Sequence, residues 1–296
     1  MSLTTIEDIN TEILLHINNP ILIQITEVLP LSSYFWTIRF KNAYGGLLNE
    51  YGDVNYRELY TQWVTMPIEK IVKILITKGY LSLLKVFIQN GYDIHYNNDE
   101  AIRIASADGQ LEIIKYLIDI GVNVFSVQNI PFYNAVINGK IEVIKYLFTL
   151  NANIIHVDNG SAVQWASEGG HLEVVQFLVE NNVNIHINNS ALYISLLNDH
   201  FDIAKYLISN GLDIHNDNDR VVRVVANKGN VKAMMFLVEN GIDITAHNNQ
   251  AINFASQASR HDLVRYLLSI GADVNYIDID REMVKILTNE YNKQNC

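Results

Sequence analysis

Residues 109–121 read GQLEIIKYLIDIG, and this stretch decides the fold. Its apolar side chains recur at the spacing of one helix face; they are Leu111, Ile114, Leu117 and Ile118. Gly109 and Gly121 stand at the two ends, where a residue in the left-handed conformation closes a helix and glycine adopts that conformation most easily. The stretch therefore predicts an amphipathic helix between two turns.

The same pattern returns about every thirty residues along the chain. In each copy a glycine, or a residue that can imitate one, is followed twelve residues later by another. The pairs are Gly79/Gly91, Gly109/Gly121, Gly139/Asn151, Gly170/Asn182, Asp199/Gly211, Gly229/Gly241 and Ser259/Gly271. Such periodic self-similarity is typical of a stacked repeat array, whose units pack only on their neighbours and present one long surface to a partner.

A shorter helix is predicted before each longer one. In residues 100–109, EAIRIASADG, Ile102 and Ala105 face one side, and a polar turn, residues 92–99, comes before them. Asx residues precede the shorter helix in five copies and are predicted to cap it at about 1 kcal/mol each; they are Asp99, Asn129, Asn189, Asp219 and Asn249, with Gly160–Ser161 in the sixth copy.

Four helix ends lack glycine at the paired positions. Asn151 and Asn182 are predicted to take the left-handed conformation instead, because asparagine tolerates it better than most residues. Asp199 and Ser259 are poorer substitutes, and we expect each of them to weaken its own helix end.

The repeated segments resemble the ankyrin consensus AxxxGHxxxVxxLLxxGADVN. Examples are SADGQLEIIKYLIDIGVNV (106–124), SEGGHLEVVQFLVENNVNI (167–185) and the literal GADV (271–274). The resemblance implies an all-α fold, an ankyrin-type α-solenoid of stacked helix pairs over residues 67–296, with seven pairs. It also implies structural roles for His171 and His200, which fall on the GH position.

The chain departs from that consensus in two ways. Its units run 29 to 31 residues, whereas about 33 are usual, and the TPLH signature is replaced throughout, with Pro131 alone surviving. We therefore expect short turns or vestigial hairpins in place of full hairpin fingers. Short, Asn- and Ile-rich units of this kind resemble the ankyrin proteins of giant DNA viruses of amoebae (Mimivirus-like).

The two ends of the chain lie outside the regular pattern. Residues 1–66 are predicted to form an N-terminal helical segment, in which INTEILLHI (9–17) resembles the opening LPxEILxxI of an F-box. The alternative is a plain helical extension that packs on the first repeat. At the other end, residues 279–292 are predicted to form a capping helix that covers the last apolar face.

Composition narrows the classes of partner. The 21 Lys and Arg against 32 Asp and Glu give a net charge of −11, which disfavours nucleic acid because its phosphates require a basic stripe. No apolar run reaches the length of a membrane span, and no secretory leader is recognisable. The one cysteine, Cys296, closes no intrachain disulfide. We expect an intracellular, cytoplasmic monomer (in the host cytoplasm if viral) that binds neither membrane nor nucleic acid.

No motif for catalysis, cofactor binding or metal binding is present; GxSxG, a P-loop, HExxH and GxGxxG are all missing. His95, His186 and His215 recur at one turn position. Equivalent residues of neighbouring repeats lie about 10 Å apart, whereas zinc ligands converge to within about 2 Å of the ion. These histidines are therefore interpreted as turn-stabilising residues, and we expect no enzyme activity, cofactor or metal.

A variable row of residues is the candidate recognition site. It occupies the position of the TPLH histidine, which is predicted to line the concave inner face, and consists of Arg103, Tyr133, Gln164, Tyr193, Arg223 and Asn253. Tyr and Arg often dominate protein interfaces, although drift at exposed positions explains the variation equally well. Trp165, one residue along from this row, is interpreted as a packing residue.

The turn tips join this predicted surface; they are Tyr96, Phe125, Asp158, Asn188, Asp217 and His247. Of these, the aromatic Tyr96 and Phe125 are the first candidates for partner contact. The predicted function is a non-catalytic protein–protein interaction scaffold. The alternative is a substrate-recruiting adaptor of a cullin-type ubiquitin ligase, docked through the F-box-like segment.

Overall fold

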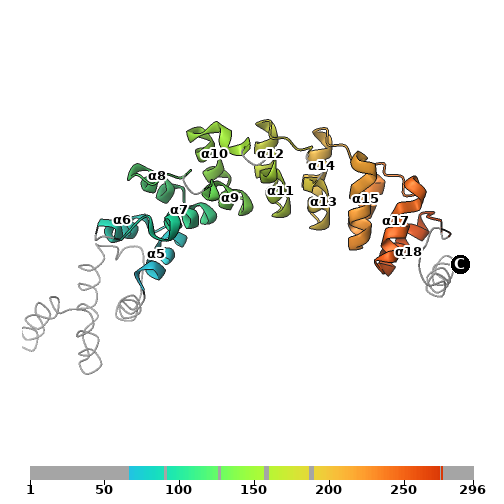
Figure 1. The fold of residues 1–296 in the computed structure, drawn as a ribbon, viewed down its shortest axis with the longest axis horizontal. Coiled ribbons are helices and arrows are strands. Elements are labelled where there is room, and N and C mark those ends of the chain that lie inside the picture. The colour runs from blue at the N-terminus through green and yellow to red at the C-terminus, as the bar shows by residue number, and fades with distance from the viewer. Residues whose placement is uncertain are drawn as a thin grey trace, which may run out of the picture. The chain divides into compact units, whose positions relative to one another are not determined.

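The computed structural model describes residues 67–89, 92–125, 128–156, 160–186, 190–273 and 275. Within these ranges the chain forms helices and turns and contains no strand (Figure 1). The predicted N-terminal segment 1–66 and capping helix 279–292 lie outside the described residues. The chain divides into two compact units, Met1–Pro131 and Phe132–Cys296.

The described residues of the first unit form two helix pairs. Its described helices are α5 (Ile68–Thr77), α6 (Leu81–Gln89), α7 (Tyr96–Asp108) and α8 (Leu111–Asp119). Helix α5 packs on its partner α6 and on α7, the first helix of the next pair, which in turn packs on α8. Within this unit, the contact between the first helices α5 and α7 therefore joins the two pairs.

The described residues of the second unit form five helix pairs of the same kind. Its elements are α9 (Ile130–Ile137, which begins at the boundary), α10 (Ile141–Leu150), η2 (Ala152–His156), α11 (Ser161–Glu168), α12 (Leu172–Glu180), α13 (Ser190–Leu197), α14 (Phe201–Ser209), α15 (Asn216–Lys228), α16 (Val231–Glu239), α17 (Ala246–Gln257) and α18 (His261–Ser269). Helices α11, α13, α15 and α17 pack in succession, and each also packs on its own second helix. The seven predicted helix pairs are confirmed.

The buried stripe of each second helix differs slightly from the prediction. In α8 the buried side chains are Ile113, Ile114 and Leu117, whereas Leu111 and Ile118 are only half-buried. Because second helices pack on both their own first helix and neighbouring second helices, two adjacent positions per turn are covered. Ile113, absent from the predicted face, is 1% exposed. Burying such a side chain stabilises the fold by about 1.5–3 kcal/mol.

The helix ends confirm the predicted left-handed closures with one exception. Gly109 has φ 79°, and the substitutes Asn182, Asp199 and Ser259 have φ 62°, 61° and 57°. Asn151 was predicted to behave in the same way, and that prediction is wrong, since its φ is −152°. There α10 runs on to Leu150, and the chain turns through the 3₁₀ helix η2 instead. Gly91 lies outside the described residues.

The Asn151 exception has a local cause. The Oδ1 atom of Asn151 accepts a hydrogen bond from the backbone N–H of Asn153 at 3.1 Å. Its backbone carbonyl accepts one from the N–H of Ile154, also at 3.1 Å. These two bonds satisfy the turn in an extended conformation that asparagine adopts without steric cost.

Polar side-chain contacts also join neighbouring helix pairs. Before five of the second helices, α8, α12, α14, α16 and α18, the preceding residue bonds through its side chain to a backbone carbonyl near the end of the preceding pair's first helix, where carbonyls lack helical partners. The bonds are Gln110 Nε2 to Thr77 O (2.9 Å), His171 Nε2 to Ile137 O (2.8 Å), His200 Nε2 to Glu168 O (3.2 Å), Asn230 Nδ2 to Leu196 O (3.2 Å) and Arg260 Nε to Asn227 O (2.8 Å). The structural roles expected for His171 and His200 are confirmed.

These side-chain bonds between pairs also explain why glycine occupies the positions that face His171 and His200. A Cβ atom added to Gly139 would collide with the His171 ring, and one added to Gly170 would collide with the His200 ring. Glycine at these two positions serves both the left-handed turn and the close approach of the next repeat.

Candidate recognition surface

The predicted row of variable residues is here named the first-helix row; it consists of Arg103 in the first unit and Tyr133, Gln164, Tyr193, Arg223 and Asn253 in the second. Each member is half-buried. Each follows a fully buried residue of its first helix, such as Ile102 before Arg103 or Leu192 before Tyr193. The row therefore lies at the edge of the core, where a side chain is held on one side and accessible on the other.

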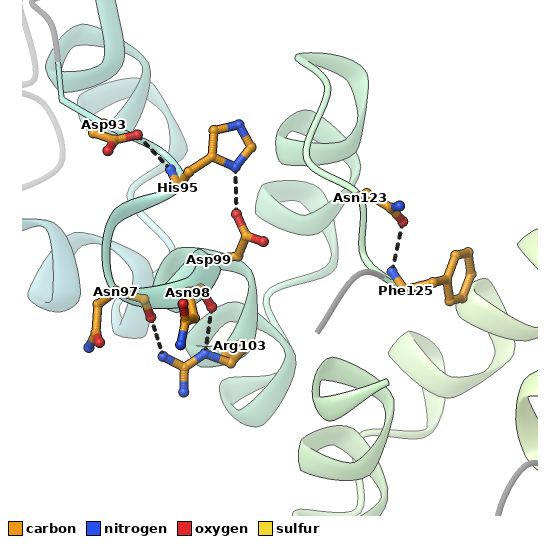
Figure 2. Close-up of polar contacts among 8 residues, drawn as sticks. All are labelled: Asp93, His95, Asn97, Asn98, Asp99, Arg103, Asn123 and Phe125. Atoms are coloured by element: carbon orange, nitrogen blue, oxygen red, sulfur yellow. Dashed lines mark hydrogen bonds and ion pairs between the residues drawn. The ribbon is translucent and has the colours of Figure 1, made fainter. Parts of the chain in front are cut away.

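The first turn of α7 has an unusual backbone (Figure 2). Asn97, Asn98 and Asp99 have φ values of 51°, 56° and 55°, so that three successive residues are left-handed. The Oδ1 atom of Asp93 accepts a hydrogen bond from the N–H of His95 at 2.9 Å and fixes the start of the turn. Left-handed backbone costs roughly 1–2 kcal/mol per residue without glycine, so the surrounding contacts must hold this turn.

Asp99 was predicted to cap α7, and the structure gives it a different role. Its left-handed backbone is not the extended conformation of an N-cap residue. Asp99 is buried, with 9% of its surface exposed. Its Oδ1 atom lies 2.6 Å from Nδ1 of His95. The capping interpretation also fails elsewhere: Asn129, Asp219 and Asn249 share the left-handed conformation, Gly160 makes no side-chain cap, and Asn189 lies outside the described residues.

The same contact recurs four repeats later. Nδ1 of His215 lies 3.0 Å from Oδ1 of Asp219, which is 7% exposed. The interpretation of His95 and His215 as turn-stabilising residues is confirmed. The pairing itself was not foreseen, although the four-residue spacing is visible in the sequence. Within the described residues, no group of three or more His, Cys, Asp or Glu side chains could hold a metal ion.

Arg103 contributes to the turn as well as to the first-helix row (Figure 2). Its guanidinium donates from Nη2 to the carbonyl of Asn97 at 2.7 Å and from Nε to the carbonyl of Asn98 at 3.0 Å. These bonds satisfy carbonyls of the left-handed turn with a charged donor, which is stronger than a neutral one. Arg103 therefore positions the turn that carries Tyr96, whose side chain is 43% exposed.

The two aromatic turn tips differ in exposure. Tyr96 is exposed, whereas Phe125 is half-buried and follows an Asx turn in which Asn123 Oδ1 accepts the N–H of Phe125 at 3.0 Å. Asp158 and Asn188 lie outside the described residues, and so do the side chains of Asp217 and His247.

Tyr92, close to this turn in the sequence, has a raised pKa. Burial, together with the nearby carboxylates of Glu100 and Glu69, raises the pKa of Tyr92 to about 12. Both causes disfavour a tyrosinate anion, the first because a charge loses hydration and the second by repulsion between like charges. The Tyr92 phenol therefore stays neutral at alkaline pH values at which a free tyrosine ionises.

In the second unit, aromatic members of the row contact the next repeat. The rings of Tyr133 and Trp165 meet edge to face with centroids 5.0 Å apart, and Tyr133 also touches Phe132 at 5.7 Å. The Arg220 guanidinium lies over the ring of Tyr193 at 5.8 Å. The prediction that Trp165 packs between repeats is confirmed, and both tyrosines are held by a neighbour.

The remaining members line hollows or make local bonds. Arg223 lines an open hollow of about 310 Å³ with Val224, Asn227, Lys228 and Phe254. Gln164 lines a much smaller one of about 30 Å³ beside Ser161 and Asn184. Asn253 accepts a hydrogen bond at Oδ1 from Nε2 of Gln257 at 2.9 Å.

A second aromatic row was not foreseen. The same position of each second helix from α8 to α18 carries a half-buried ring; the residues are Tyr116, Tyr146, Phe177, Tyr206, Phe236 and Tyr266. Phe177 contacts Phe148 at 5.4 Å and Phe236 stacks on Phe201 at 5.5 Å. Phe177 and Phe236 therefore pack against the neighbouring second helix, which gives these two positions a role in packing.

The helices that the structure describes include none with the length and apolar character of a membrane span.

Known proteins share this repeat pattern. Residues 72–158 and 132–218 match the family model "Ankyrin repeats (3 copies)". Among solved structures, the crystal structure of the human ASB11 ankyrin repeat domain matches with a TM-score of 0.53 and 23% sequence identity. That match covers 63% of this chain and 95% of that one, and its low identity supports the fold alone. A comparison with curated proteins found no match. Residues 72–218 thus carry ankyrin repeats, and the described residues have the all-helical fold of an ankyrin-type solenoid.

Proposed function

We propose that this chain is a non-catalytic scaffold that binds a protein partner through the first-helix row and the neighbouring turn tips. Ankyrin repeats are protein–protein interaction modules, which supports the general role. The specific observation is the contrast between rows: buried positions repeat nearly the same apolar residues, whereas Tyr133, Tyr193 and Arg223 vary at the core edge. Such a surface combines a fixed frame with a partner-specific set of side chains.

The geometry of the row favours binding energetically. Immobilising a free side chain at an interface costs roughly 0.5–1.5 kcal/mol. Tyr133 is already held against Trp165 and Phe132, and Tyr193 lies under Arg220. Their rings therefore lose less conformational freedom on binding, and Tyr and Arg are the residues that most often form hot spots.

A triple variant of the full chain tests this proposal. Tyr133→Ala, Tyr193→Ala and Arg223→Ala are combined, and partners are captured from native cells and identified by mass spectrometry. Arg103 is left intact because it holds its own turn. We expect the captured partner to be lost while the circular dichroism spectrum keeps its helical shape.

The matched control changes two tyrosines and one cationic residue on second helices. It combines Tyr146→Ala, Lys205→Ala and Tyr206→Ala, and we expect it to retain the partner. Equal loss in both triple variants would indicate a general effect on folding, and retention in the row variant would refute the proposed surface.

The ligase-adaptor role is a second proposal, supported by INTEILLHI (9–17) alone. If it holds, the full chain retains cullin-ligase components, and Ile13→Asp with Leu14→Asp removes them while the row's partner stays bound. Failure of the unmodified chain to retain any ligase component removes this role.

We also propose, from the short Asn- and Ile-rich units, that the protein is of the giant-virus type and acts in the host cytoplasm. A fluorescent fusion expressed in amoebae should fill the cytoplasm. Concentration in the nucleus or secretion would contradict this placement.

A further inference from the structure

An open hollow lies between two neighbouring first helices of the second unit, α15 and α17, which pack on each other. Arg223, Val224, Asn227 and Lys228 line the hollow from α15, and Phe254 lines it from α17. Its volume of about 310 Å³ is at the lower end of the range of ligand pockets. The hollow therefore has room for one or two side chains of a partner.

Val224 and Phe254 form an apolar wall of the hollow. Both are half-buried, and both stand at the position that Trp165 occupies in α11. The smaller Val224 side chain leaves space beside α17 that a tryptophan would fill. Arg223 already has an interaction of its own and serves here only as a side wall.

Two cations at the rim of the hollow are available to a ligand. Lys228 is exposed in the last turn of α15, and its amine makes no ion pair or hydrogen bond with any other described residue. The exposed Arg260 side chain packs against Gly229, and its Nε donates to the carbonyl of Asn227 at 2.8 Å. That bond uses one of the five N–H donors of a guanidinium group, so the donors of its two Nη atoms remain for a ligand.

The acidic residues in the turns nearby in the sequence are matched to other cations. The Oδ2 atom of Asp199 lies 3.5 Å from Nζ of Lys232. The Oδ1 atom of Asp262 lies 3.4 Å from Nη1 of Arg265. The two rim cations therefore form a basic spot beside an apolar wall, in a chain whose net charge is −11.

The spacing of the wall and the rim limits what fits. Lys228 stands four residues after Val224 on α15, so their Cβ atoms lie about 5–6 Å apart on one helix face. A ligand must therefore carry a negative group close to an apolar side chain. A single residue supplies both only at the C-terminal end of a chain, where the carboxylate and the side chain share one Cα.

We propose that the hollow binds the C-terminal residue of the protein partner, with its carboxylate at Lys228 and Arg260 and its apolar side chain against Val224 and Phe254. The inference rests on the proposed function and names the part of the partner that is recognised. Ammonium and guanidinium groups form charge-assisted hydrogen bonds with a carboxylate, and the buried apolar side chain acts as an anchor of the interface.

A library of random peptides displayed with free C-termini tests the proposal on the unmodified full-length protein. We expect it to enrich peptides that end in Leu, Ile, Val or Phe. The best peptide is then synthesised in three forms: with a free terminal carboxylate, with a terminal amide, and with two glycines added at the C-terminus. We expect the amide and the extended form to raise the Kd by about tenfold or more, the loss typical of hydrogen bonds to a charged group.

A charge variant tests the two rim cations. Lys228→Gln with Arg260→Gln removes both charges. Glutamine is tolerated before a second helix, because Gln110 at the equivalent position donates from Nε2 to the Thr77 carbonyl at 2.9 Å. We expect the Kd of the free-carboxylate peptide to rise by about tenfold or more and that of the amide to change by less than about twofold. The control, Lys140→Gln with Lys205→Gln, removes two cations elsewhere in the second unit and should leave both Kd values unchanged.

A steric variant tests the apolar wall. Val224→Trp fills the hollow with the side chain that α11 carries at the same position, Trp165, and we expect it to weaken the free-carboxylate peptide by about tenfold or more. Ile104→Trp, the same change at the equivalent position of the first unit, is the control and should not weaken it. Circular dichroism melting shows that each variant is folded.

Several outcomes overturn the proposal. They are failure to enrich any peptide, equal binding of the carboxylate and the amide, equal binding of the extended peptide, and an unchanged Kd in the charge variant or in Val224→Trp. Equal binding of the extended peptide would show that an internal segment is recognised instead. The comparison of peptide forms uses the unmodified protein, so it decides the question even if a variant does not fold.

Capture of the native partner separates this inference from the proposed function. If Tyr133→Ala with Tyr193→Ala loses the partner and Lys228→Gln with Arg260→Gln keeps it, the first-helix row binds the partner and the C-terminal inference fails. If neither variant loses the partner, the proposed function itself fails.

Discussion

The rings of Tyr133 and Trp165 meet edge to face across two neighbouring helix pairs, with their centroids 5.0 Å apart and their planes at 70°. One of these residues belongs to the variable first-helix row and the other stands one position after it. Packing between repeats and presentation of a recognition side chain therefore depend on the same contact.

The first prediction concerns the strength of this contact. A double-mutant cycle of Tyr133→Leu and Trp165→Leu should give a coupling free energy of about 0.5–1.5 kcal/mol, the range of aromatic pairs beyond their burial. The measurement is urea unfolding followed by circular dichroism. Effects that add within about 0.3 kcal/mol would show that the two rings do not stabilise each other.

The second prediction concerns helix closure without glycine. Ser259 is left-handed at φ 57°, a conformation that costs a side-chain-bearing residue about 1–2 kcal/mol, while glycine loses about 0.5–1 kcal/mol in chain entropy. Ser259→Gly should therefore raise the free energy of unfolding by roughly 0.5 kcal/mol. A decrease of similar size would contradict this reasoning.

Asp199 supplies the matched comparison for that substitution. It is also left-handed, at φ 61°, but its carboxylate accepts from Asn230 Nδ2 at 3.0 Å and lies 3.5 Å from Lys232 Nζ. The Asn230 bond and the nearby Lys232 lower the pKa of Asp199. Asp199→Gly loses these contacts, so we expect it to gain less stability than Ser259→Gly or to lose some.

The third prediction concerns the bridge between repeats. His171→Ala removes the bond from Nε2 to the Ile137 carbonyl and should lower the free energy of unfolding by about 1–2 kcal/mol. His186→Ala is the control, because the contact of the exposed His186 with Asn184 uses only its backbone N–H, and we expect a change within about 0.5 kcal/mol. Equal losses in thermal or urea unfolding would argue against the bridge.

The fourth prediction concerns alkaline pH. The pKa of Tyr92 is raised from about 10 to about 12 in the folded chain. Between these values the unfolded chain loses the phenol proton and the folded chain keeps it, so ionisation favours unfolding and stability falls as pH rises. Tyr92→Phe removes this contribution. Its stability relative to the unmodified chain should therefore rise between about pH 10 and about pH 12, as measured by urea unfolding, whereas parallel curves would contradict the shift.

The repeat architecture could be predicted from sequence because its glycines and apolar residues recur at regular spacings. Glycine pairs and apolar stripes located every helix pair, and the left-handed positions of Asn182, Asp199 and Ser259 were correct. The prediction for Asn151 was wrong because its side chain accepts a local hydrogen bond from the backbone N–H of Asn153, which the spacing does not reveal. Ile113 was missed because a helix covered on two sides buries more than one simple stripe.

The turns were predicted less well, for a related reason. An Asx residue before a helix suggests a cap, yet Asp99 turns left-handed and faces His95 because Asp93 and Arg103 fix the turn around it. That arrangement depends on several residues at once. The first-helix row was predicted to line the inner face, and that placement stays a prediction; the structure shows that its residues are half-buried. The role of Arg103 in its own turn depends on hydrogen bonds to two backbone carbonyls, which the sequence pattern does not reveal.

Photo-crosslinking tests the central claim most directly. A photoreactive phenylalanine analogue replaces either Tyr193 on the first helix α13 or Tyr206 on the second helix α14 of the same repeat; both side chains are half-buried. In cells that contain the partner, the account predicts a crosslinked protein band from position 193 and none from position 206. A band from position 206 alone would show that the partner binds the second helices and would contradict the account.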